Sequence, residues 1–215
     1  MKGDKMKHVD FSTVDRLLEW DDKLRDGDLS MDQWAIETLL SDCRVKGVPI
    51  VFYAPGSDAA VTLSLAAGVD FTPQNPEGET VLFDGAHLEI TAYGRVAESF
   101  AKRGKIDLAE TEGLTALSAQ VKFGNLDRVK LLLRHGADVG RFATIARYGN
   151  ARLTIPQQAI NVMTTAGPAE KETLSITLLD LLKAHGLRLD AAEKSDLLQR
   201  ARTGPRLHEW IDRNL

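Results

Sequence analysis

Cysteine is almost missing from this chain, because only Cys43 occurs among its 215 residues. One cysteine excludes an internal disulfide framework and a zinc site made of cysteines alone, and it suits a reducing compartment. Long apolar runs are missing as well: no segment approaches about eighteen uninterrupted apolar residues, and the opening MKGDKMKHVDF leads into no apolar core of a signal peptide. We therefore expect a cytoplasmic protein that does not cross a membrane.

The chain also lacks a strong charge of either sign. Its formal net charge is -4, from 27 Lys and Arg against 31 Asp and Glu. This net charge produces no electrostatic field that would favour a nucleic acid or an anionic membrane as a partner. With 43% hydrophobic and 27% charged residues, the composition is that of an ordinary globular protein with a substantial core.

Clusters of reactive side chains are sparse. The five histidines lie at positions 8, 87, 135, 185 and 208, and no two of them have the i, i+4 or short-loop spacing of a metal site. Asp84 and His87 are three residues apart on a predicted helix, but without a third partner such a pair is more typical of a local salt bridge. The glycines in GSDAA and RYGNAR lack the context of a phosphate-binding loop. We therefore predict no catalytic residues, no cofactor and no metal.

What the chain does contain is a helix-turn-helix pattern in EGLTALSAQVKFGNLDRVKLLLRHGADV, residues 112–139. Thr115 can cap the first helix through its hydroxyl. Gly124, nine residues later, can take the left-handed conformation that ends this helix.

A second helix is predicted from Asn125 to His135, and Gly136 stops it. Val129, Leu132 and Leu133 fall at i, i+3 and i+4, so they share one apolar face that a neighbouring element must cover.

This stretch resembles an ankyrin repeat. It departs from the Thr-Pro-Leu-His of that family at two places, where Ala116 replaces proline and Ser118 replaces histidine. We expect both changes to weaken local stabilising contacts without disrupting the helix-turn-helix repeat. One such unit cannot bury its own apolar face, so the resemblance implies several units at a period of about 33 residues.

Further copies fit that period. Gly104 stands 32 residues before Gly136, and Thr80 stands 35 residues before Thr115. The second copy carries about three extra residues, predicted near 90–94, and the last about eleven, predicted as a surface loop at 164–172. The repeats are predicted at about 47–75, 76–110, 111–141 and 150–190, within a repeat region of 47–190.

Both ends are predicted to be helical caps, since the end units of a repeat array must hide one apolar face from water. In the N-terminal cap, residues 1–46, we predict a helix from Phe11 to Arg25 capped by Ser12 or Thr13, and a second helix from the capping box of Ser30 and Gln33 to about Lys46. The C-terminal cap, residues 191–215, should contain two helices separated by Gly204-Pro205. The expected fold class is an all-α, ankyrin-like solenoid.

The resemblance also implies where a partner binds, because ankyrin arrays usually meet partners on a concave side made of loop tips and first-helix ends. Leu88, Leu114 and Phe123 are apolar at positions that solvent should reach, as in an interface core. Equally, insertions near Ile90 or Thr164 could fold over and cover them. By position, the candidate partner-binding residues are Glu77, Glu79, His87, Leu88, Thr111, Glu112, Leu114, Lys122, Phe123, Asn150 and Leu153.

The favoured function is a non-enzymatic, monomeric module that binds another protein, for example an inhibitor or an immunity protein that neutralises a toxin. A tight binder of this size needs nothing beyond a surface. The alternative is an effector or enzyme whose site lies in the irregular region 141–172. That region has arginines but no histidine, cysteine or aspartate.

Overall fold

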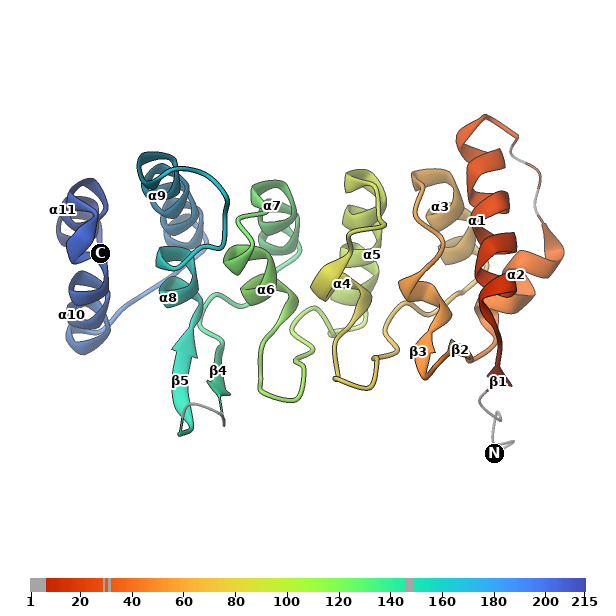
Figure 1. Ribbon diagram of the computed structural model, residues 1–215, viewed down its shortest axis with the longest axis horizontal. Coiled ribbons are helices and arrows are strands. Elements are labelled where there is room, and N and C mark those ends of the chain that lie inside the picture. The colour runs from red at the N-terminus through yellow and green to blue at the C-terminus, as the bar shows by residue number, and fades with distance from the viewer. Residues whose placement is uncertain (1–6, 29, 31, 146–148) are drawn as a thin grey trace. The chain divides into compact units, whose positions relative to one another are not determined.

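The computed structural model describes residues 7–28, 30, 32–145 and 149–215. The chain forms two compact units, Met1–Thr111 and Glu112–Leu215, which we describe in turn. Both units are built mainly from pairs of short helices (Figure 1).

The first unit combines short helices with a small sheet. The strand order is β1-β2-β3, with β1 parallel and β3 antiparallel to β2. Helix α3 packs against both α1 and α5. The elements are β1 (Lys7–His8), α1 (Phe11–Arg25), α2 (Gln33–Leu40), β2 (Cys43–Val45), β3 (Val48–Pro49), the 3-10 helix η1 (Ile50–Phe52), α3 (Asp58–Ala66), α4 (Val81–Asp84) and α5 (Ile90–Lys102).

The bounds of α1 confirm the predicted first helix, but its cap differs. Asp10 occupies the N-cap position, and the Ser12 hydroxyl donates a hydrogen bond to the Asp10 carboxylate at 2.5 Å. The second helix is shorter than predicted. Its predicted cap was also wrong, because the Asp32 side chain accepts from the Ala35 backbone N at 3.2 Å. Helix α2 ends at Leu40 because the following residues form β2, which pairs with strands on both sides.

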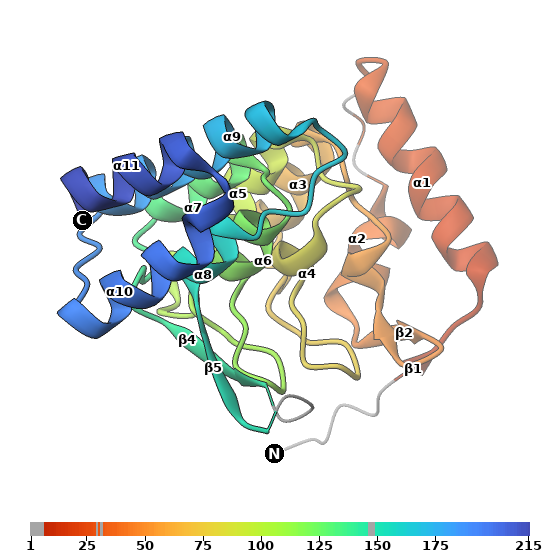
Figure 2. The ribbon, with the colours of Figure 1, turned by 60° about the vertical axis from the view of Figure 1, so that its left-hand side comes forward.

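The described residues of the second unit form three helix pairs and one β-hairpin (Figure 2). The hairpin strands are antiparallel, in a register that runs from Phe142 opposite Thr154 to Ile145 opposite Ala151. Helix α6 packs on α7 and α8, and α9 packs on α8 and α11. The elements are α6 (Ala116–Lys122), α7 (Leu126–Arg134), β4 (Phe142–Ile145), β5 (Ala151–Thr154), α8 (Ile155–Ile160), α9 (Pro168–Ala184), α10 (Ala191–Arg200), the 3-10 helix η3 (Ala201–Thr203) and α11 (Pro205–Asn214).

The helix pair α6 and α7 confirms the pattern on which the sequence interpretation rested. The Thr115 hydroxyl accepts from the Ser118 backbone N, and the Ser118 hydroxyl accepts from the Thr115 backbone N at 2.9 Å. Gly124 has φ +71° and Gly136 has φ +84°. The Ser118 hydroxyl thus completes a capping box with Thr115 at the position where the family pattern has histidine.

The fold is mostly helical, as expected, but it is not all-α. The region 141–172, expected to be irregular, holds β4, β5, α8 and the first turn of α9. The surface loop predicted at 164–172 is shorter, because Pro168 already begins α9, which has 17 residues against 9 in α7. Much of the surplus length therefore extends a helix. In the second repeat, α4 has only four residues, and α5 is lengthened to 13.

The cores of the repeats are filled from matching positions of their second helices. Phe100 in α5, Leu132 in α7 and Leu182 in α9 each stand four residues before a closing glycine, and all three are buried. The repeating apolar face predicted from the sequence is therefore core.

Candidate functional site

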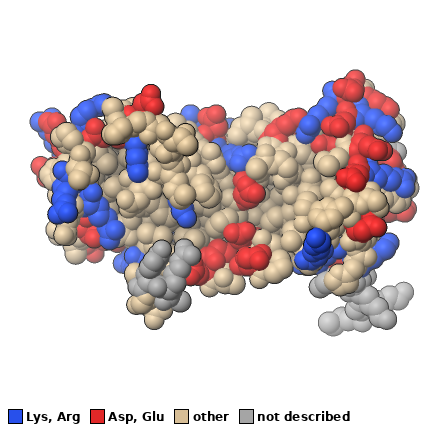
Figure 3. Space-filling view, viewed as in Figure 1, with Lys and Arg blue, Asp and Glu red and all other residues tan. Residues whose placement is uncertain are grey.

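The loop tip before α4 brings several predicted binding residues of the first unit together. The Asn75 side-chain oxygen accepts from the backbone N of Glu77 and of Glu79, at 3.1 and 2.8 Å. The Thr111 backbone N donates to the Glu77 carbonyl at 3.3 Å. Gly78 has φ +83°, and a Cβ added to it would lie only 3.2 Å from the Thr111 N atom. Glu77 and Thr111 are therefore exposed neighbours. Asp and Glu side chains gather below α4 and α5 in Figure 3.

Two other predicted residues of this unit are less accessible. His87 is half-buried, and Leu88 is only 3% exposed, so the expectation that solvent reaches Leu88 was wrong. Helix α4 ends after one turn at Gly85, with φ +58°, and the Leu88 N–H donates to the Gly85 carbonyl at 3.0 Å. Leu88 and His87 thus lie in a tight turn after α4, and not on one continuous helix with Asp84. The length of the first helix in the clear repeat therefore does not apply to α4, which has four residues.

In the second unit, the segment that leads into α6 lies against the hairpin. The Glu112 carbonyl accepts from the Thr144 backbone N at 2.9 Å. At Gly113, with φ +93°, a Cβ would lie 3.3 Å from the Cα of Ala143, so this contact requires glycine. Glu112 and Leu114 flank that glycine and are both half-buried beside β4.

The end of α6 carries an exposed aromatic side chain, as predicted. Phe123 is 46% exposed, and the Nζ of half-buried Lys122 lies 5.8 Å from the centroid of its ring. The Lys122 carbonyl accepts from the backbone N of Met163 at 2.6 Å, and Met163 is 57% exposed. Two large apolar side chains are therefore accessible at the ends of consecutive first helices.

Met163 was missed because the repeat register slips by one residue. The sequence pattern placed Val162 at the position of Phe123, but Val162 is buried. Phe123 is the C-cap residue of α6, but α8 has six residues against seven and its C-cap is Asn161, so Val162 lies beyond the helix and does not take the position of Phe123.

The hairpin adds a third exposed apolar side chain. Phe142 is 49% exposed, and the guanidinium carbon of Arg152 lies 4.3 Å from the centroid of its ring. Of the predicted residues, Asn150 is exposed with φ +62° ahead of β5, and half-buried Leu153 pairs with Ala143. Phe142 was missed because the strand that presents it was not predicted.

Comparisons with known proteins agree with this geometry. The family model of the ankyrin repeat matches residues 112–142. The chain therefore contains an ankyrin repeat. The fold is similar to the crystal structure, at 1.00 Å resolution, of an ankyrin repeat domain from Acinetobacter baumannii AYE, with a TM-score of 0.60. The two chains are 18% identical over 94% of this chain and 96% of the other, so this likeness shows the fold alone. No curated protein is similar in sequence to the chain.

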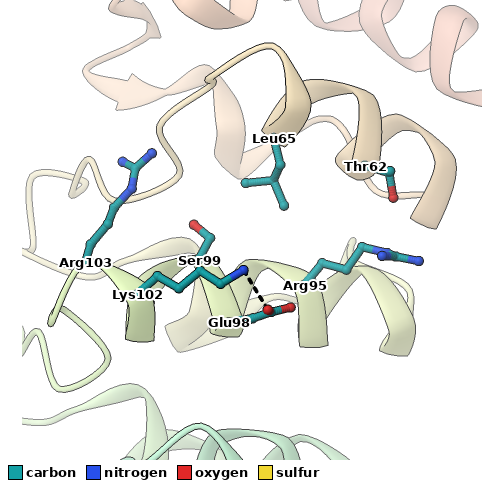
Figure 4. Close-up of a pocket in the computed structure, with 7 residues that line it drawn as sticks. All are labelled: Thr62, Leu65, Arg95, Glu98, Ser99, Lys102 and Arg103. Carbon is teal, nitrogen blue, oxygen red and sulfur yellow. Dashed lines mark ion pairs between the residues drawn. The ribbon is translucent and has the colours of Figure 1, made fainter.

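Besides its loop tips, this ankyrin repeat protein has a pocket of about 320 Å³ between α3 and α5. In Figure 4, Leu65 points from α3 toward α5, where Ser99 faces it. The lining cations are already paired: Arg95 with Asp58, Lys102 with Glu98 and Arg103 with Asp70. The hydrogen bonds that Arg95 donates to the Asp58 carboxylate lower the pKa of Asp58 and raise the pKa of Arg95. The pairs of Arg95 and Arg103 join segments 37 and 33 residues apart in the chain, whereas Lys102 and Glu98 pair within α5.

The described residues of the ankyrin repeat protein contain no group of three or more His, Cys, Asp or Glu side chains that could hold a metal ion. Nor does any helix in the described ranges combine the length and apolar character that a membrane crossing requires.

Proposed function

We propose that this ankyrin repeat protein is a non-enzymatic module that binds another protein through its loop tips and first-helix ends. Ankyrin repeats generally mediate interactions between proteins. The residues proposed to touch the partner in the second unit are Lys122, Phe123, Leu153 and the newly found Phe142 and Met163. In the first unit they are Glu77, Glu79 and Thr111.

The observation that carries this proposal is the exposure of Phe123 and Met163. Each leaves about half of its surface in water, and the backbone bond between Lys122 and Met163 joins the two chain segments. Exposed aromatic and methionine side chains with a polar rim are enriched in the centres of interfaces. Neither side chain is needed for the core, so a partner offers the best physical account of both.

We expect the double change Phe123→Ala and Met163→Ala to weaken partner binding by at least about 30-fold, the effect of losing one interface hot spot of about 2 kcal/mol. Thermal stability should change little, because both side chains are largely exposed. Binding is measured by calorimetry with a partner isolated on the immobilised wild-type chain. Leu40→Ala is the matched control, because Leu40 is an equally exposed leucine, 51%, at the end of α2. Equal affinity for the double variant and wild type would contradict the proposal.

We further propose that the partner is a toxin and that this chain acts on it as a monomeric inhibitor or immunity protein. The exposed and half-buried carboxylates of Glu77 and Glu79 would steer a basic partner surface to the first unit. A reducing, cytoplasmic setting suits the lone Cys43, which is buried, and burial raises the pKa of its thiol.

The immunity proposal predicts protection from the product of a neighbouring gene. Co-expression of the wild-type chain should restore growth of cells that produce that protein, and the Phe123→Ala, Met163→Ala variant should not restore it. Growth is followed by plating efficiency, with Leu40→Ala as the control that still protects. Failure of the wild type to protect would reject immunity while leaving the binding module to be tested with other partners.

We do not propose catalysis in region 141–172. Its described part folds into the hairpin, α8 and the start of α9, and the sequence of the region contains no histidine, cysteine or aspartate to act as a nucleophile or general base.

A further inference from the structure

A second cavity, of about 210 Å³, lies inside the second unit between the helix pair α8 and α9 and the segment η3 with α11. Its polar lining comes mainly from Lys171, Glu172 and Ser175 of α9, Arg200 of α10 and Thr203 of η3. Ligand pockets for cofactors and drug-sized molecules start at about 300 Å³, so this cavity suits one compact chemical group.

Ser175 indicates that the cavity is built to hold a polar group. The residue is only 1% exposed, and its hydroxyl has no hydrogen-bond partner among the described residues. A buried hydroxyl without a partner is unfavourable, and a bound water or ion is one way in which native proteins satisfy it.

The charge next to this hydroxyl is positive. Lys171 precedes Ser175 by one helical turn, so the two side chains share a face of α9, and Lys171 makes no ion pair within the described part of the chain. Arg200 donates through Nε to Asp196 at 2.6 Å, and this bond lowers the pKa of Asp196. The two terminal nitrogens of the Arg200 guanidinium can still donate to a ligand.

The one carboxylate in the lining, Glu172, is engaged by the start of α11. Gly204 at the N-cap of α11 has no side chain to cap the helix, and Glu172 Oε1 accepts from the Leu207 backbone N at 2.7 Å instead. The partial positive charge of this helix end offsets the charge of Glu172. Asp196 offsets the charge of Arg200, so Lys171 supplies the net positive charge next to the Ser175 hydroxyl.

We propose that this cavity binds a phosphate group, either free or carried on a peptide, between Lys171, Arg200 and the Ser175 hydroxyl. Donors from two helices, Lys171 and Ser175 of α9 and Arg200 of α10, suit an oxyanion with several acceptor oxygens better than a carboxylate with two. The proposal is independent of the partner surface at Phe123 and Met163, because it uses none of those side chains.

The test compares binding of inorganic phosphate by calorimetry at constant ionic strength, with chloride as the reference salt. The wild type should bind phosphate saturably at one site. Lys171→Gln should weaken binding by about tenfold or more, and Ser175→Ala by about threefold or more, since each removes a direct donor. Lys183→Gln, in the last turn of the same helix, should bind as the wild type does.

The same titrations with a phosphoserine peptide and its unphosphorylated form separate the two sources of phosphate. Tighter binding of the phosphopeptide assigns the site to a partner, and equal or weaker binding assigns it to the free ion. Ser175→Ala must keep or raise the melting temperature of the wild type, which separates loss of the ligand from loss of the fold. Absence of saturable binding, or equal loss in Lys171→Gln and Lys183→Gln, means an adventitious ion only and overturns the proposal.

Discussion

Replacing Asp21 with alanine is expected to lower the free energy of unfolding by about 3 to 5 kcal/mol, the range for removing one member of a buried charged network. Asp21 lies on α1 and is 1% exposed. Its carboxylate accepts from the backbone N of Gly56 at 3.2 Å, from the backbone N of Ser57 at 3.0 Å and from the Ser57 hydroxyl at 2.5 Å. It also pairs with Arg25 at 3.2 Å. The change leaves two buried N–H groups without an acceptor.

This carboxylate fastens the N-terminal helix pair to the first repeat. Ser57 is the N-cap of α3, so Asp21 reaches from α1 to the start of α3. Gly56 must be glycine at this junction, because a Cβ there would lie 2.5 Å from the His87 carbonyl oxygen. Loss of Asp21 should therefore loosen the end of the first unit and expose the apolar face that α1 covers.

Urea unfolding followed by tryptophan emission measures the loss, since Trp20 lies one residue before Asp21 and is buried. Asp22→Ala is the matched control: Asp22 is 72% exposed, and its contact with Arg25 is 3.7 Å long, so its loss should stay below about 0.5 kcal/mol. If Asp21→Ala lowers the free energy of unfolding by less than about 1 kcal/mol, the hydrogen bonds of Asp21 do not stabilise the first unit as proposed.

The role of Asp21 could not be predicted from the sequence. An aspartate on an amphipathic helix is normally assigned to the solvent-facing side, and its partners lie 35 and 36 residues away in the chain. The helix pair α6 and α7 could be predicted, because Thr115, Gly124 and Gly136 act through bonds within their own turns.

For a third group of residues, the repeat was predicted correctly but the exposure of the individual side chain was not. Val162, expected at the end of α8, lies one residue beyond the C-cap Asn161 and is buried, whereas Met163 is exposed. Leu88 is buried because α4 stops after a single turn. A template taken from one clear repeat fixes the average spacing of the others, but the exposure of a side chain changes when an element gains or loses one residue. A change of one residue in the length of an element therefore invalidates the prediction of single contact residues but not the prediction of the fold.

The strands show a further reason for failure. Each strand of the hairpin has four residues, and β4 alternates exposed and buried side chains, from Phe142 to Ile145. A pattern this short is compatible with strand, turn or helix end, so tertiary contacts decide among them. One such contact is the bond from Thr144 N to the Glu112 carbonyl.

Leu132→Ala should lower the free energy of unfolding by about 2 to 5 kcal/mol, the usual cost of replacing a fully buried leucine and leaving a cavity. Leu132 is 0% exposed in α7 and lies on the face that Val129 and Leu133 share. Each repeat buries this face only by packing on its neighbours, so a cavity here should weaken the stack as well as one helix pair.

The measurement is urea unfolding followed by circular dichroism, with Leu131→Ala as the matched control. Leu131 is the adjacent leucine of the same helix but is half-buried, so its loss should be smaller by about 1 kcal/mol or more. Equal losses for the two variants would mean that the periodic face is not the core of the repeat. While Leu132→Ala remains folded, it should bind the partner as the wild type does, because the proposed contact surface includes exposed Phe123 and Met163 and not this buried face.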